Sequence, residues 1–67
     1  MQKQENYTDA RYSIGTYIRL HTDDLWNGMF GIIDDLVGDT IVVHCTRMPL
    51  HRYYVNVYDA GSILELV

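Results

Sequence analysis

Apolar and polar residues alternate in several short stretches of this chain, which is typical of β-strands with one buried face. The first clear example is residues 16–21, where Ile18 and Leu20 alternate with Arg19 and His21. Successive side chains of a strand point to opposite faces. We therefore expect a strand here, with Ile18 and Leu20 facing the core.

The same pattern predicts four further strands, over residues 29–37, 40–45, 52–58 and 63–67. Gly38 and Asp39 separate two β-branched segments, as the turn of a two-residue hairpin would. Residues 59–62 are predicted to form a short turn. The inward-facing side chains of these strands are expected to be Ile33, Ile41, Val43, Val55, Val57 and Ile63, with Leu66 as a further candidate.

Residues 1–12 mix polar side chains without apolar periodicity, which is typical of a flexible tail. The domain is expected to span residues 13–67. Five short strands without an amphipathic helix predict an all-β fold, a five-stranded SH3-like small barrel of packed, curved sheets.

A polar loop over residues 22–28 contains two bulky apolar residues, Leu25 and Trp26, directly before Asn27 and Gly28. Asn-Gly readily supplies a positive φ, so we expect a turn there. One apolar side chain of the loop is expected to close the end of the barrel. We assign that place to Leu25 or Met29, which leaves Trp26 partly exposed.

From Gly15 to Val67 the chain resembles the KOW motif and its SH3-like barrel. The resemblance rests on a set of residues in order, namely Ile18-Arg19-Leu20, the polar loop, Gly31, Ile33, Leu36, the hairpin with Ile41 and Val43, Val55-Asn56-Val57 and the closing segment 63–67. It implies a sharp backbone bend at the glycine matching Gly31. It also implies a binding module, because KOW domains of elongation factors and ribosomal proteins dock onto RNA, polymerase or ribosomal surfaces without doing chemistry.

Chain length and cysteine content limit the classes of function and the cellular compartment that we expect. A domain of 67 residues has only about 3–10 kcal/mol of stability, which leaves little for a strained catalytic site, so we expect no enzyme. The lone cysteine, Cys45, permits no internal disulfide, which favours a reducing cytoplasm. No stretch approaches a membrane span or resembles a leader, so a soluble protein is expected.

Three histidines and Cys45 raise the question of a metal site. His44 and Cys45 are adjacent on a predicted strand and so face opposite ways, and His21 and His51 have no paired ligand nearby. Alternation places Cys45 inside, where a thiol is unreactive. The acid pairs 23–24 and 34–35 lack the spacing of a calcium loop. We therefore predict no metal, no cofactor and no catalytic residue.

Exposed aromatic side chains beside acids predict contact with another protein, with a basic or proline-rich surface as the matching partner. The expected partner-binding residues are Trp26, Asp23, Asp24, Tyr54 and Tyr58, with Tyr17 nearby. Outward-facing Ile32 and Val42, beside Tyr54, form a possible second interface. The alternative for that second patch is that the N-terminal segment, with Tyr7 and Tyr12, folds back over it.

Two other functions remain open at this stage. A KOW-like nucleic-acid-binding domain would use Arg19, Arg47, Arg52 and His51, with base stacking as the main contribution. The net charge of −4, from five basic and nine acidic residues, makes this the second choice. A structural homo-oligomer, joined through Ile32, Val42 and Tyr54, is the third. The first choice fits a small regulatory or accessory protein, monomeric or weakly dimeric, that acts on the transcription or translation machinery, and a viral origin is compatible with it.

Overall fold

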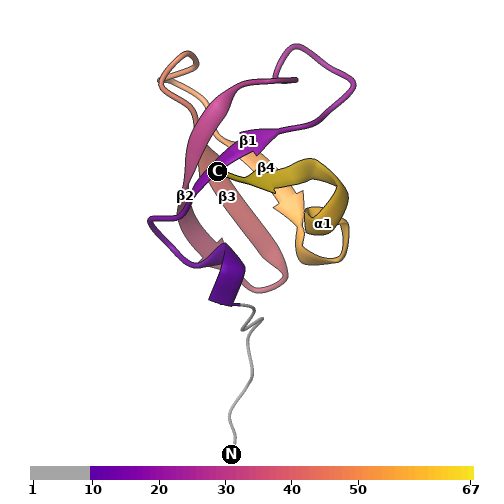
Figure 1. The fold of residues 1–67 in the computed structure, drawn as a ribbon. Coiled ribbons are helices and arrows are strands. Elements are labelled where there is room, and N and C mark those ends of the chain that lie inside the picture. Colours follow the sequence, from indigo (N-terminus) through magenta and orange to yellow (C-terminus); the bar gives the residue numbers. More distant parts are fainter. Residues whose placement is uncertain (1–9) are drawn as a thin grey trace, which may run out of the picture.

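The computed structural model describes residues 10–67 and contains five antiparallel strands in a single sheet (Figure 1). The strands are β1 (Tyr17–Leu20), β2 (Phe30–Val37), β3 (Thr40–His44), β4 (Tyr53–Asn56) and β5 (Leu64–Leu66), and their order in the sheet is β4-β3-β2-β1-β5. β4 and β5 form the two edges and do not pair with each other, so the sheet is unclosed. The prediction of an all-β fold with five strands is confirmed.

Alternation correctly predicted inward-facing side chains on each of the first four strands, including Val55 on β4, which is buried. Ile18 and Leu20 on β1, Ile33 on β2, and Ile41 and Val43 on β3 are all buried. The β2–β3 hairpin also forms as expected, with Val37 opposite Thr40. Gly38, at the first central position of its turn, has a φ of +58°, which is the requirement of a type II′ turn.

A β-bulge lies inside β2, between Ile33 and Asp35. Ile33 pairs with Val43 and Asp35 with Val42, so Asp34 is the extra residue. Strict alternation from Ile33 would turn Asp35 toward the core. The bulge instead leaves both aspartates exposed and returns Leu36 to the inner side, where it packs against the core.

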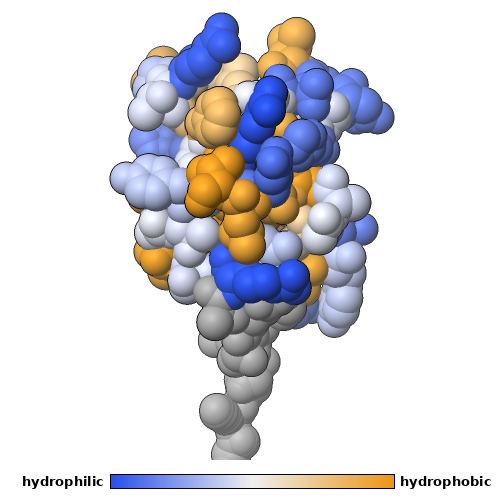
Figure 2. Space-filling model, viewed as in Figure 1, coloured by the Kyte–Doolittle hydropathy of each residue, from blue (hydrophilic) through white to orange (hydrophobic). Residues whose placement is uncertain are grey.

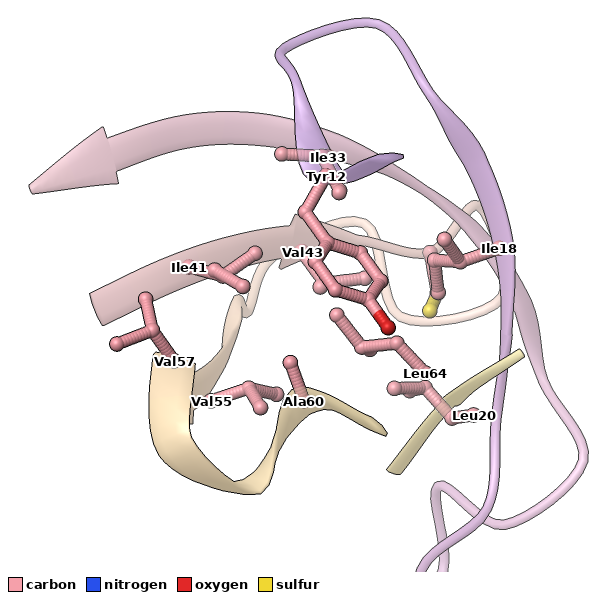
Figure 3. Packing of buried hydrophobic residues seen from close by; sticks show 11 residues of the cluster. Tyr12, Ile18, Leu20, Ile33, Ile41, Val43, Val55, Val57, Ala60 and Leu64 are labelled. Carbon is pink, nitrogen blue, oxygen red and sulfur yellow. The ribbon is translucent and has the colours of Figure 1, made fainter. Parts of the chain in front are cut away.

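The core lies between the inner face of the sheet and the segments that cross it, and most of its side chains are aliphatic (Figure 3). Tyr12 belongs to it and is only 3% exposed. It is the last residue of a 3-10 helix, η1 (Ala10–Tyr12), and Figure 3 shows its ring directed among Ile18, Val43 and Leu64. The predicted boundary at residue 13 therefore separates Tyr12 from the domain that it packs into. The rest of the predicted tail, residues 1–9 with Tyr7, lies outside the described residues.

The segment before the last strand is helical rather than a simple turn. A 3-10 helix, η2 (Val57–Asp59), leads into one turn of α-helix, α1 (Ala60–Ile63). The Asn56 side chain accepts a hydrogen bond from the Tyr58 backbone N–H (2.9 Å), which caps η2. Because α1 takes up Ile63, the strand begins at Leu64, which is the buried residue of β5.

The orientation of the last strand accordingly differs from the prediction. Ile63 still packs against the core from α1, but Leu66 is 42% exposed and does not belong to the core. Among the described helices, none has the length and apolar character needed to cross a membrane.

Gly31, the glycine of the KOW resemblance, lies within β2 opposite Ile18, and its φ is not positive. A Cβ atom at this position would stand 2.8 Å from the Cys45 Sγ, 2.8 Å from the His44 carbonyl oxygen and 3.0 Å from the Val43 Cγ1. Glycine is required here because β2 and β3 approach closely at this point.

Candidate functional site

The loop between β1 and β2 is held together by the carboxylate of Asp24. Its Oδ1 accepts hydrogen bonds from the Thr22 hydroxyl and from the Trp26 backbone N–H (2.9 Å). Its Oδ2 accepts a hydrogen bond from the Tyr53 hydroxyl of β4 (3.0 Å). The hydrogen bond from Thr22, followed by those from Trp26 and Tyr53, lowers the pKa of Asp24 below its ordinary value. Asp24 thus fastens the loop to the sheet.

Trp26 is the apolar residue that this loop turns inward. Its ring lies 5.2 Å from that of Tyr53, at a tilt of 47°, and packs against the core. Leu25 is 87% exposed, so its predicted anchoring role is wrong. Met29, the other residue named for that role, packs against the core together with Trp26. Trp26 remains partly exposed, as expected.

The predicted partner-binding residues do not form one surface. Tyr53 and Tyr54 are neighbours on β4 and face opposite ways, so Tyr54 lies on the other side of the strand from Trp26. Tyr58 is exposed on η2, and Asp23 is exposed in the loop. Asp24 is occupied by the loop's own hydrogen bonds.

The hydrogen bonds of Asp24 predict a dependence of stability on acidic pH. Because its folded-state pKa is lowered, the carboxylate contributes stability that is present above the unfolded value, near 3.8, and lost as the pH falls through the folded value. We expect Asp24→Asn to be less stable than the wild type at neutral pH. The difference should shrink below pH 3.8, as urea unfolding at a series of pH values would show. A difference that stayed constant across this range would contradict the assignment.

A separate hollow of about 260 Å³ opens on the outer face of the sheet, over β1 and β2. We call it the apolar groove. It is lined by Tyr17, Ile18, Phe30, Gly31, Ile32, His44, Thr46 and Val67. Tyr17, Ile32 and His44 stand in one row across three strands, because Tyr17 pairs with Ile32 and Ile32 with His44. The sequence neighbours of these three residues, Ile18, Ile33 and Val43, are buried. Since successive side chains of a strand point to opposite faces, the row faces away from the core.

Several of the apolar side chains that line the groove are exposed to solvent. Tyr17 is 66% exposed, Phe30 60% and Val67 67%. Hydrophobic side chains gather in the centre of this side of the molecule, where the C-terminus lies (Figures 1 and 2). Ile32, predicted to be an interface residue, contributes to the lining. Val42, predicted to be exposed beside it, is buried at 8%, and it stands in register between Asp35 and Tyr54.

One polar atom of the groove lining lacks a partner. The Nε2 atom of His44 is buried and makes no hydrogen bond. Leaving a buried polar atom unpaired costs roughly 1–3 kcal/mol.

The cations of the predicted nucleic-acid surface are dispersed. Arg19 lies on β1 with its guanidinium carbon 5.4 Å from the centre of the Phe30 ring, and its Nε donates to the Gly28 carbonyl oxygen (3.3 Å). Arg52 forms an ion pair with Asp34 at 2.8 Å. Arg47 and His51 are exposed in the connection between β3 and β4.

Cys45 is fully buried on the face opposite His44, as predicted. Burial raises the pKa of the Cys45 thiol, which keeps it protonated. Within residues 10–67, no three side chains of His, Cys, Asp or Glu come together as metal ligands would.

Sequence reasoning did not single out Phe30 and Val67. A signal was available, because Phe30 has the same parity as Ile32 on its strand, and Tyr17 and Arg19 alternate with Ile18. Only the strand pairing, however, places these positions side by side.

No protein-family model matches this chain, and comparisons with curated proteins and with solved structures gave no match.

Proposed function

We propose that this chain is a non-enzymatic protein-binding module whose contact surface is the apolar groove. The observation that carries the proposal is the gathering of Tyr17, Phe30 and Val67, all largely exposed, around one apolar hollow. Exposed apolar patches with a polar surround usually mark an interaction site. Aromatic residues are also enriched where proteins meet.

We further propose that the domain is an SH3-like small barrel of the KOW type. The strand order β4-β3-β2-β1-β5, the long β2 with its bulge, and the 3-10 turn before the last strand support this assignment. Small barrels of this kind host many unrelated functions. The fold therefore supports a regulatory or accessory role only in general terms, and the groove supplies the specific argument.

Nucleic-acid binding is the second candidate, favoured by one observation. Tyr17 and Phe30 are exposed aromatics on adjacent strands, and Arg19 stacks on Phe30, an arrangement on which bases can stack. The ion pair between Arg52 and Asp34 removes one of the expected cations. The third candidate, a homo-oligomer through Ile32, Val42 and Tyr54, is weakened because Val42 is buried.

The test is a charge introduced into the groove. We expect Phe30→Glu to weaken binding of a native protein partner by roughly 30-fold or more, because truncating a central aromatic anchor commonly costs about 2 kcal/mol. The fold should be retained because the side chain is exposed. Proteins captured from native cell extract by the wild type and by each variant would be quantified, and their affinities measured by calorimetry.

Tyr54→Glu is the matched control, since Tyr54 is an equally exposed aromatic on a strand outside the groove. It should bind as the wild type does. If Tyr54→Glu loses the partners and Phe30→Glu keeps them, the contact surface is elsewhere. If single-stranded RNA shifts the amide resonances of the groove and no protein depends on Phe30, the second candidate replaces the first.

A further inference from the structure

We propose that the apolar groove receives one bulky apolar side chain from an acidic peptide segment of a partner protein, with an acidic residue of that segment facing Arg19. This inference rests on the proposed protein-binding function and adds the chemistry of the partner. It differs from the basic or proline-rich partner expected from the sequence, because Asp24 is committed to its own loop.

The size of the groove favours a peptide over a second copy of the chain. Its volume of about 260 Å³ suits a single large side chain, and eight residues line it. A stable protein–protein interface takes roughly 20–30 residues from each side. An anchor side chain with a few flanking residues fills a site of this extent, whereas a folded domain would also need contacts well beyond the groove.

The charge beside the groove favours acidic flanks. Arg19 is paired with Phe30 across β1 and β2, and its guanidinium carbon lies 5.4 Å from the centre of the Phe30 ring. In the part of the chain that the structure describes, Arg19 forms no ion pair. The protein as a whole carries a net charge of −4, so this basic position is a local exception.

One acidic side chain does lie near Arg19, because Glu65 pairs with it in register across β1 and β5. The Glu65 Oε1 is 2.6 Å from the His21 Nε2, and the hydrogen bond from His21 is the main cause that lowers the pKa of Glu65, with Arg19 as a smaller cause. The carboxylate is therefore engaged by His21, and the Arg19 guanidinium keeps donors for a ligand.

The lining of the groove determines the anchor. Ile32 and His44 stand side by side in it, between the exposed rings of Tyr17 and Phe30 and the side chain of Val67. A ligand with an apolar anchor and a flanking carboxylate therefore matches the groove and the arginine beside it.

The experiment selects peptides from a random library displayed on phage, against the full chain. We expect the enriched sequences to combine a large apolar residue with Asp or Glu neighbours. Synthetic versions of these peptides should bind wild-type protein, and replacing their acids by Lys should abolish binding. Arg19→Gln should weaken binding roughly three- to tenfold and flatten its salt dependence. Tyr54→Ala, outside the groove, should have no effect.

Several results would overturn the inference. Enrichment of basic or proline-rich peptides that depend on Phe30 would refute the acidic partner and leave the proposed function intact. Enrichment of no peptide, or of peptides indifferent to Phe30→Glu, would refute the groove as a peptide site. A Phe30-dependent dimer in sedimentation would assign the groove to a second copy. The proposed function itself fails only if no native protein partner depends on Phe30.

Discussion

Tyr12→Ala is expected to cost about 3–5 kcal/mol, the range for removing a large aromatic side chain from a core. Tyr12 is 3% exposed, and its ring packs among core residues of three strands, β1, β3 and β5 (Figure 3). A domain of this size has a total stability of only about 3–10 kcal/mol. The loss is therefore a large fraction of the total, and the midpoint of urea unfolding should fall to a much lower urea concentration. Urea unfolding followed by circular dichroism and by the fluorescence of Trp26 would measure the loss.

Two control variants test whether the cost comes from the loss of a buried ring, rather than from the loss of any tyrosine or of the hydroxyl alone. Tyr58→Ala removes an aromatic that is 82% exposed and should change stability by less than about 0.5 kcal/mol. Tyr12→Phe keeps the ring in place and should cost less than about 1.5 kcal/mol. If Tyr12→Ala were as stable as the wild type, the domain would begin after residue 12, as the sequence pattern alone predicts.

Gly31→Ala should cost about 1–3 kcal/mol, the usual penalty for overfilling a well-packed site. The added Cβ would meet the Cys45 Sγ and the His44 carbonyl oxygen, both at 2.8 Å. The carbonyl belongs to the backbone of β3, so relief requires β2 and β3 to move apart. The free energy of unfolding, measured in urea, would show the cost directly.

Gly61→Ala is the matched control for Gly31→Ala. Gly61 lies in α1, nothing stands within 4 Å of an added Cβ there, and its φ is not positive. This substitution should be neutral or slightly stabilising. The cost of Gly31→Ala should also fall in a Cys45→Ala background, because one of the three close contacts is then absent. An unchanged cost in both backgrounds would assign the clash to the His44 carbonyl and the Val43 side chain.

Alternation predicted the strands well because each of the first four has one face on the core. It fixed Ile18 and Leu20 on β1 and Val55 on β4 without any knowledge of their partners. It gave the wrong orientation at Leu66, where a helical turn displaces the start of the strand. Alternation also could not predict that Tyr12 is buried, because a single buried side chain outside a strand gives no repeating pattern of apolar residues.

The loop and the site depended on contacts between distant residues. Leu25 and Trp26 are both apolar neighbours in sequence, and the ring contact with Tyr53 decides which of them turns inward. The exposed aromatics of the groove lie on separate strands, and only the pairing of Tyr17 with Ile32 and of Arg19 with Phe30 gathers them. The residue types were enough to predict an exposed aromatic surface, but its position depends on the register between the strands.

The bulge at Asp34 has a consequence for comparing this chain with others. Insertions are ordinarily tolerated in loops, and alignments are built on that expectation. Here one extra residue sits inside the longest strand, with correctly paired residues on both sides. A protein of the same fold that lacks the bulge would align with this chain only if a gap were opened within β2. Without that gap, Leu36 would be matched to an outward-facing position, and the second half of the hairpin would look unrelated.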